Sequence, residues 1–416
     1  MTLAASLSGT AWLTNGPVAR LFEMLDCDGE EARVVGGAVR DALIGRPVGE
    51  IDIATTALPE EVVRRAERAN IRSVPTGIDH GTVTLIVEGH PFEVTTLRED
   101  VETFGRKAKV AFGRSWAHDA QRRDFTINAL SASRDGKLHD YVGGLADLEA
   151  RRVRFIGDAG TRIAEDYLRI MRFFRFHAAF GEGPPDAIAL AACIAAREGL
   201  DTLSRERVRQ ELLKLLTARR APQVAWVMAD AGLLARILGG VPLVFSLARM
   251  AEIEHSLNVA PDALRRLGAL ALFVAEDAER LFLRLRLSNA EYQRLVRMSV
   301  GWWRIEPAMP ATEARALVYR LGTAGYIDRA MLAWSRSQDA ADDASWQALA
   351  RFPQAWTPPR FPLAAADLIE LGVVKGPALG VALRTAEEAW IAADFPADES
   401  EIAQIALLAA NSEARN

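Results

Sequence analysis

The stretch VVGGAVRDALIGRPVGEIDIAT, residues 34–55, contains the pattern on which the fold assignment rests. It begins with the apolar end of a strand, continues through the consecutive glycines Gly36 and Gly37, and leads into a short helix that Gly45 ends. Glycines let a backbone approach a phosphate closely and expose amide groups to it. The stretch lacks both Gly-x-Gly-x-x-Gly and Gly-Lys-Ser/Thr, so it is neither a Rossmann fingerprint nor a Walker loop. It therefore predicts a phosphate-binding turn of another kind.

Two acidic residues stand near the end of the same stretch. Glu50 and Asp52 are two positions apart in a segment with strand alternation, so we expect both side chains on one face. Two carboxylates at one point are costly unless a cation neutralises them, and Mg²⁺ prefers such oxygen ligands together with substrate phosphates. Arg40, one helical turn after the glycines, is placed to pair with a triphosphate oxygen. Each feature alone is commonly a plain turn or a solvated edge, but their combination predicts a site for Mg²⁺ and a nucleotide.

The composition is that of a globular chain. The 416 residues suggest two or three domains, with 50% hydrophobic and 25% charged residues. Two cysteines are too few for a disulfide framework or a zinc cluster. No apolar run approaches the roughly 18 residues of a membrane span, and Met1–Phe22 has no signal-peptide pattern. We therefore expect a cytoplasmic protein with no membrane partner.

Strand and helix signals alternate over the first part of the chain, whereas helical periodicity dominates from about residue 160 onward. Pro59–Arg68 is typical of a helix, and Thr82–Val87 with Phe92–Leu97 is typical of a hairpin. The pattern predicts an α+β protein, with a mixed-sheet head followed by a helical body. We expect a head in residues 1–150, a helical neck in 151–230, and a helical body and tail in 231–416.

The formal net charge of −5 conceals one strongly basic segment. Residues 151–175 contain seven arginines and three acidic residues, which gives this segment a local net charge of +4. Arginine is the basic residue best suited to bidentate contacts with phosphates and bases. The segment is therefore a candidate surface for a polyanion.

Several motifs, in order along the chain, resemble the class II tRNA nucleotidyltransferase and poly(A) polymerase family, most of all its CCA-adding type. They are VGGAVRD (35–41), EIDIAT (50–55), RRDFTINAL (122–130), DYVGGLADL (140–148), EDYLRIMR (165–172) and LSRERV (203–208). The resemblance covers residues 33 to about 215. It implies a polymerase-β-like nucleotidyltransferase head followed by an all-helical neck, body and tail. One position departs from the family's Asp-x-Asp pattern, because Glu50 places its carboxylate one methylene further out.

The resemblance implies template-independent addition of C, C and A to the 3′ end of tRNA from CTP and ATP. It implies two Mg²⁺ ions held by Glu50, Asp52 and a third carboxylate from a neighbouring strand, for which Glu93 is our candidate. Asp166 and Arg169, expected as neighbours on one helical face, would read the base. The remaining nucleotide-binding candidates are Gly37, Arg40, Arg123, Arg172 and Arg175.

The same resemblance assigns roles to other parts of the chain. Arg98–His118 is polar and resembles the family's flexible loop, which helps to switch the pocket from C to A. The helical neck and body would bind the acceptor and T arms of tRNA by shape and phosphate contacts. No obligate protein partner is implied. We expect His118 and Asp119 to be structural, and Trp302 and Trp303 to lie in a helical core rather than to form a base-stacking platform.

Two other functions are also compatible with these sequence motifs. A bacterial poly(A) polymerase shares the head motifs but usually has a basic C-terminal extension, whereas Ile391–Asn416 is acidic here. A tRNA-binding protein without catalytic activity is the other alternative, if Glu50 has weakened the metal site.

Overall fold

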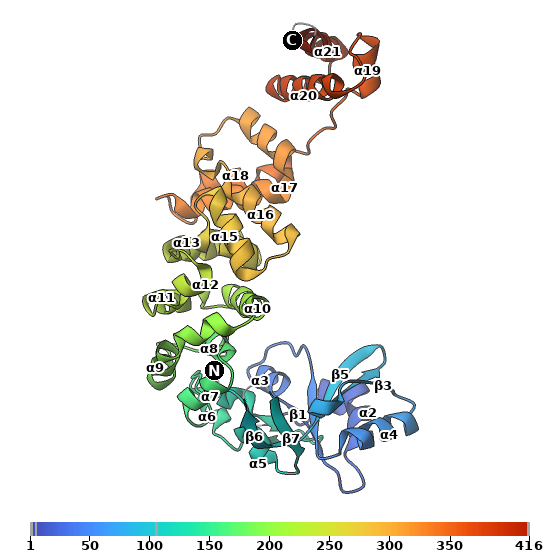
Figure 1. The fold of residues 1–416 in the computed structure, drawn as a ribbon, viewed down its shortest axis with the longest axis vertical. Helices are drawn as coiled ribbons and strands as arrows, with labels where there is room; N and C mark the ends of the chain where they lie inside the picture. Colours follow the sequence, from blue (N-terminus) through green and yellow to red (C-terminus); the bar gives the residue numbers. More distant parts are fainter. Residues whose placement is uncertain (1–2, 5, 105–106, 414–416) are drawn as a thin grey trace. The chain divides into compact units, whose positions relative to one another are not determined.

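The computed structural model describes residues 3–4, 6–104 and 107–413. The chain divides into two compact units, Met1–Leu233 and Leu234–Asn416. All the strands that the structure describes belong to the first unit, and the described part of the second unit is helical (Figure 1). The α+β class expected from the sequence is therefore confirmed. The further division of the first unit at residue 150 remains a prediction.

Seven strands form one mixed sheet in the first unit, in the order β3-β4-β5-β2-β1-β8-β9. Only the β2–β5 pair is parallel among these described strands, and the other neighbours are antiparallel. Alternating burial along β4 is typical of a strand with one covered face. Their bounds are β1 Ala32–Val35, β2 Asp52–Thr55, β3 Arg72–Gly77, β4 Thr82–Val87, β5 His90–Thr96, β8 Ser131–Ala132 and β9 Leu138–His139.

Helices cover the sheet and continue the first unit beyond it. Helices α2 and α4 pack against each other and against sheet strands, and α8 packs against α7, α10 and α11. Phe173 on α8 is fully buried beside Phe125 and Phe155, so an aromatic cluster fixes α8 to the preceding segments. The helices are α1 Ala11–Thr14, α2 Gly16–Leu25, α3 Gly37–Leu43, α4 Pro59–Arg68, η1 Ile78–His80, α5 Trp116–Gln121, η2 Thr126–Asn128, α6 Gly144–Glu149, α7 Ala159–Glu165, α8 Leu168–Phe180, α9 Ala187–Ala195, η3 Arg197–Thr202, α10 Arg205–Leu216 and α11 Ala221–Asp230.

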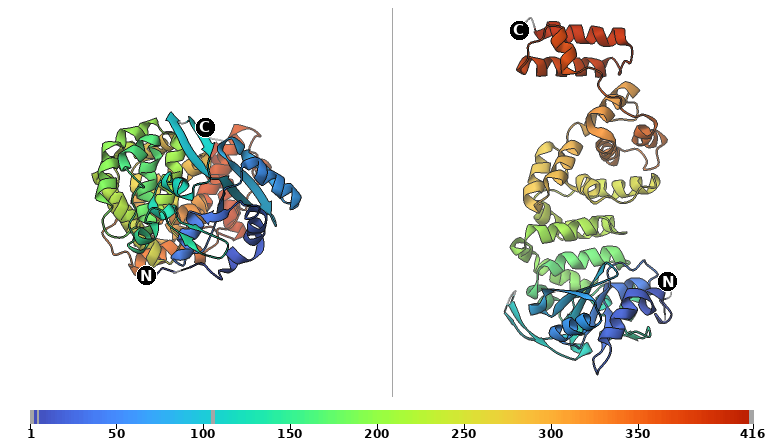
Figure 2. Two further views of the ribbon diagram at one scale, coloured as in Figure 1. Left: turned by 90° about the horizontal axis from the view of Figure 1, so that it is seen from below. Right: turned by 90° about the vertical axis from the view of Figure 1, so that its right-hand side faces the viewer.

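The second unit is built from helices (Figure 2). Buried charge networks lie in its interior. Asp328, which is 1% exposed, pairs with both Arg265 and Arg294, and Glu254 pairs with Arg266. None of the described helices is long and apolar enough to cross a membrane. The helices are α12 Leu233–Leu238, α13 Val244–Ser256, α14 Ala263–Ala271, α15 Ala275–Leu285, α16 Asn289–Ser299, η4 Trp302–Arg304, α17 Ala311–Arg336, α18 Ala344–Ala355, α19 Ala365–Glu370, α20 Pro377–Ala392 and α21 Glu399–Glu413.

The structure corrects two local expectations. The segment expected as a flexible loop contains a two-stranded antiparallel sheet, β6 Arg98–Phe104 and β7 Lys107–Phe112, while Gly105 and Arg106 lie outside the described residues. Trp302 and Trp303 are not in a helical core, because they form a short 3₁₀ turn and Trp303 is 58% exposed.

Candidate active site

A cavity of about 590 Å³ in the first unit collects nearly all the predicted site residues. Its walls come from the β1–α3 turn, the loop before β2 with the first residue of β2, the segment after α5, and the start of α10. The segment before α8, and α8 as far as Phe176, complete them. Nine of the ten predicted residues line it, namely Gly37, Arg40, Glu50, Asp52, Arg123, Asp166, Arg169, Arg172 and Arg175. Glu93 does not line it. The walls also include Gly36, Arg122, Asp124, Asn128, Leu168, Phe176 and Arg207.

The glycine turn has a backbone that only glycine adopts easily. Gly36 has φ 71° and ψ −121°, and a Cβ atom there would lie 3.3 Å from Nη1 of Arg123. The same nitrogen of Arg123 donates a hydrogen bond to the carbonyl of Asn128 (3.3 Å). Gly36 therefore allows a cavity arginine to pack directly against the turn.

Arg40 is held firmly by protein groups. It is 7% exposed, its Nη1 donates to Oδ1 of Asn128 (2.5 Å), and its Nε and Nη2 donate to Asp41. Its guanidinium also lies over the ring of Phe180, 3.9 Å from the ring centroid. Arg40 thus joins α3 to α8, and the triphosphate contact expected from the sequence remains a prediction.

The two predicted metal ligands line the cavity from positions two residues apart, but not from one strand. Strand β2 begins at Asp52, so Glu50 lies in the preceding loop, which corrects the expectation that both residues belong to a strand. In the parallel β2–β5 ladder, Asp52 is the register partner of Glu93. Surrounding protein atoms displace part of the water near the Asp52 carboxylate, although the residue as a whole is exposed. This desolvation, with repulsion from Glu93 and Glu50, outweighs Arg123 and raises the pKa of Asp52.

These carboxylates fit a metal that takes some of its ligands from substrate. In the described part of the chain, no group of three or more His, Cys, Asp or Glu side chains is arranged to hold a metal ion. Mg²⁺ usually takes one or two protein carboxylates and completes its shell with phosphates and water. The mutual repulsion felt by Asp52 is relieved by a cation, so Glu50 and Asp52 suit such a site.

A buried aspartate orients the two arginines of the RRDFTINAL motif. Asp119, 4% exposed, pairs with Arg122 (2.8 Å) and Arg123 (3.2 Å). Burial alone would raise the pKa of Asp119, but the two arginines outweigh burial and lower it. One carboxylate between two guanidinium groups leaves one positive charge uncompensated beside the cavity.

A second polar chain crosses the cavity toward α8. Asp124 accepts hydrogen bonds from Nε of Arg172 (2.7 Å) and Nδ2 of Asn128 (3.1 Å). The guanidinium groups of Arg172 and Arg175 also lie over the ring of Phe176, at 5.3 and 4.1 Å from its centroid. Asn128 and Phe176 were not among the predicted site residues, although Asn128 belongs to the RRDFTINAL motif.

The expected base-reading pair is arranged differently from the prediction. Asp166 is extended (φ −155°) in the short segment between α7 and α8, so it does not share a helical face with Arg169. Its Oδ1 accepts from the backbone N–H of Leu168 (3.1 Å), and its Oδ2 pairs with Arg207 (2.5 Å). Arg169 pairs instead with Glu165. Both predicted residues nevertheless line the same cavity.

Comparisons with known proteins identify the family. Residues 32–154 match the poly A polymerase head domain, and residues 188–244 match the probable RNA and SrmB-binding site of polymerase A. The mitochondrial CCA tRNA nucleotidyltransferase 1 of Mus musculus is 33% identical over 389 residues, 92% of this chain and 88% of that protein. The CCA-adding enzyme of Lacticaseibacillus paracasei is 32% identical over 397 residues, 93% of this chain and 94% of that protein.

A solved structure agrees with these relatives. The CCA-adding enzyme of Bacillus stearothermophilus in complex with CTP superimposes with a TM-score of 0.75 and 26% identity, covering 95% of this chain and 98% of that one. The identities extend over nearly the whole length of both proteins, and the chain belongs to the CCA-adding tRNA nucleotidyltransferases.

Proposed function

We propose that this protein adds C, C and A to the 3′ end of tRNA from CTP and ATP and releases pyrophosphate. The observation that carries the proposal is the cavity of about 590 Å³, which combines the acidic pair Glu50 and Asp52 with a wall of arginines and with Asp166. A nucleoside triphosphate needs these three elements, since it has a polyphosphate to neutralise, a phosphorus to position and a base to recognise.

Base selection is assigned to Asp166 and Arg169. A carboxylate accepts a hydrogen bond from the exocyclic amine that both cytosine and adenine carry, while arginine donates to their ring acceptors. Uracil and guanine present different edges and would leave buried polar groups unpaired, which is costly. Arg207 and Glu165 hold the two reading side chains before a nucleotide enters. The cavity arginines Arg123, Arg172 and Arg175 are assigned to the triphosphate. Asp119, Asp124 and Glu211, respectively, hold these arginines in place.

A metal ion completes the proposed site. Nucleotidyltransferases of this family are metal-dependent, and we propose Mg²⁺ held by Glu50 and Asp52. A bound Mg²⁺ would lower the pKa of the attacking 3′-hydroxyl and stabilise the charge of the leaving pyrophosphate. The side chains of Glu50 and Asp52 would supply the negative charge that holds the ion at the cavity. Glu93, expected as a third carboxylate, is the register partner of Asp52 but does not line the cavity, and the described residues hold no three-ligand group for a metal.

The helical neck and body are proposed to bind the acceptor and T arms of tRNA through shape and phosphate contacts. A cytoplasmic location is also a proposal, which cell fractionation tests. It is separate from the finding that no described helix is suited to cross a membrane.

One incorporation assay tests the activity. The protein is incubated with Mg²⁺, labelled CTP or ATP, and in turn tRNA lacking its CCA end, tRNA ending in C, tRNA ending in CC and an unrelated RNA. We expect synthesis to stop when the CCA end is complete, with no incorporation into the unrelated RNA and none after chelation of the metal. A long adenylate ladder would instead indicate a poly(A) polymerase, and absence of incorporation would indicate a tRNA-binding protein.

A further inference from the structure

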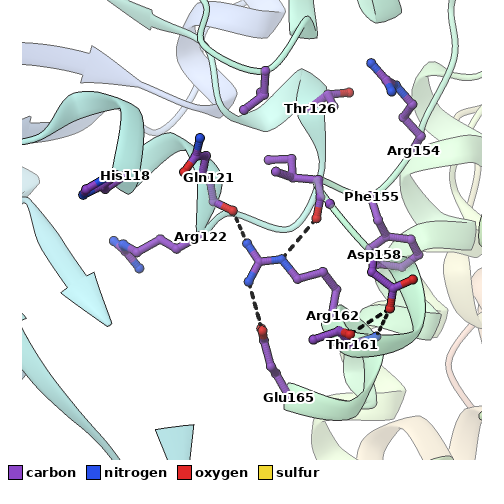
Figure 3. A pocket seen from close by; sticks show the side chains of 13 residues that line it. His118, Gln121, Arg122, Thr126, Arg154, Phe155, Asp158, Thr161, Arg162 and Glu165 are labelled. Atoms are coloured by element: carbon purple, nitrogen blue, oxygen red, sulfur yellow. Dashed lines mark hydrogen bonds and ion pairs between the residues drawn. The ribbon is translucent and has the colours of Figure 1, made fainter. Parts of the chain in front are cut away.

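The first unit contains a second and larger cavity (Figure 3). Its volume is about 940 Å³, and Arg122 belongs to the walls of both cavities. Arg162 lies between them, because its Nη2 donates to the backbone carbonyl of Arg123 (3.0 Å) and its Nη1 pairs with Glu165 (3.0 Å). The second cavity is therefore an immediate neighbour of the residues assigned to the nucleotide.

The charges around this cavity favour an anion on one side. Arg154 belongs to its wall and pairs with Asp147 (2.5 Å), a fully buried carboxylate that also pairs with Arg152 (2.5 Å). Burial would raise the pKa of Asp147, but hydrogen bonds from Thr126, Arg154 and Arg152 lower it, so the carboxylate is ionised. Asp147 thus supplies one negative charge to two arginines. Asp119 does the same for Arg122 and Arg123.

The acidic side chains of the wall are already engaged by the protein. Glu165 pairs with Arg162, and Asp158 accepts hydrogen bonds from the backbone N–H and the hydroxyl of Thr161 (both 2.7 Å) (Figure 3). Asp158 therefore caps the N-terminus of α7. Asp158 keeps its negative charge, so the three arginines of the wall exceed its two carboxylates by one positive charge.

The rest of the wall suits nucleobases. Val142, Phe155 and Ile156 contribute apolar atoms beside the arginines. Single-stranded nucleic acid is bound where basic groups meet the phosphates and apolar or aromatic groups meet the base faces, largely without regard to sequence. A strand that receives a nucleotide must place its last residues directly beside that nucleotide, because its 3′-hydroxyl attacks the α-phosphate.

We propose that the second cavity receives the single-stranded 3′ end of the acceptor RNA. Arg122 and Arg154 contact its phosphates, and the apolar side chains contact its bases. This inference rests on the proposed nucleotidyl transfer, and it adds a subsite for the acceptor RNA that is separate from the nucleotide cavity.

Asp147 offers a matched pair of variants for testing this subsite. Arg154→Gln and Arg152→Gln each remove one of its two arginine partners, and the two side chains are similarly exposed, at 42% and 51%. Only Arg154 lines the cavity. A loss of tRNA affinity that results from weaker anchoring of Asp147 should therefore appear in both variants. A loss that results from a missing RNA contact should appear only in Arg154→Gln.

The measurement compares tRNA ending in CC with the same tRNA lacking these two nucleotides, at several salt concentrations. For the natural chain and Arg152→Gln, we expect the CC end to increase affinity by the same factor. For Arg154→Gln, we expect that factor to fall by about fivefold, as for one partly exposed ion pair. The slope of log K against log salt for the CC-ended tRNA should become shallower by about 0.7, the value for one single-strand phosphate contact.

A second pair of variants tests the cavity by filling it. Thr161→Trp places a large side chain in the wall, whereas Ala164→Trp changes an exposed residue of the same helix that does not line the cavity. We expect only Thr161→Trp to abolish the affinity that the CC end adds. CTP binding, measured by calorimetry without RNA, should be the same in all four variants.

Three results would overturn the subsite. The first is an equal change in tRNA affinity for the two variants of either pair. The second is an equal loss of affinity for both tRNAs in Arg154→Gln, and the third is weaker CTP binding in Arg154→Gln or Thr161→Trp, which would indicate a second nucleotide site instead. Failure of the natural chain to bind CTP or to extend tRNA would contradict the proposed function itself.

Discussion

The substitution Asp166→Asn separates base recognition from folding. It preserves the size of the side chain but replaces a carboxylate oxygen, which only accepts hydrogen bonds, by an amide that donates them. Asp166 pairs with Arg207, and the two side chains are 33% and 40% exposed. A pair so open to solvent contributes about 0–1 kcal/mol to stability. We therefore expect the variant to fold normally.

The effect on base choice is expected to be larger than the effect on stability. A well-formed bidentate contact discriminates against the wrong base by about 1–3 kcal/mol. The amide introduced by Asp166→Asn can donate to the carbonyl oxygen of uracil, which stands where cytosine has its amine. The preference for CTP over UTP should therefore fall by about 5- to 150-fold.

The assay measures kcat/KM for single additions of CTP and of UTP to tRNA that lacks its CCA end. Arg207→Gln is the control, because it breaks the same ion pair and leaves the carboxylate in place. An unchanged CTP-to-UTP ratio in Asp166→Asn would refute the assigned role. An equal change in Arg207→Gln would show that the ion pair, and not the carboxylate, determines the choice.

Three further substitutions test the turn and the acidic pair. Glu50→Asp should change turnover by less than about tenfold, because the other predicted wall residues are in place. A gain in turnover of several orders of magnitude would show that the natural site is impaired. Asp52→Asn should raise the melting temperature of the metal-free protein at pH 7, because burial, Glu93 and Glu50 raise the pKa of Asp52 and its charged form destabilises the fold. This gain should vanish as the pH falls below about 3.9, where Asp52 is protonated in both states, and a pH-independent difference would contradict the argument. Gly36→Ala should lower the free energy of unfolding by about 1–3 kcal/mol because of its positive φ, and the melting temperature by about 2–12 °C. It should also weaken CTP binding in calorimetry, because the added Cβ displaces Arg123. Unchanged melting and binding would disprove the need for glycine there.

The sequence predicted those features that depend on local patterns. The helix Pro59–Arg68 has the expected bounds, and the hairpin of β4 and β5 has the expected alternation of apolar residues. The turn at Gly36 was predictable because two glycines interrupt a strand-to-helix transition. In these cases a few neighbouring residues determine the backbone.

Other features depend on contacts between distant segments, which no local pattern records. Asp166 has the spacing of a helical residue, yet its side chain accepts a hydrogen bond from the backbone N–H of Leu168 and pairs with Arg207, 41 positions away. Arg40 is similarly committed to Asn128, 88 positions away. The hairpin of β6 and β7 escaped prediction because the segment is rich in charged residues, although Lys107–Val110 alternates polar and apolar residues. Its residues were therefore interpreted as a loop.

The parallel pairing of β2 with β5 restricts the insertions and deletions that this chain can tolerate. Successive side chains of a strand point to opposite faces, so one residue gained or lost within β2 would turn Asp52 away from its present side and from its partner Glu93. The connection between β4 and β5 is different, because Glu88 and Gly89 form an exposed turn outside both strands. Length variation during evolution, or a peptide tag added by design, is best accommodated at that turn.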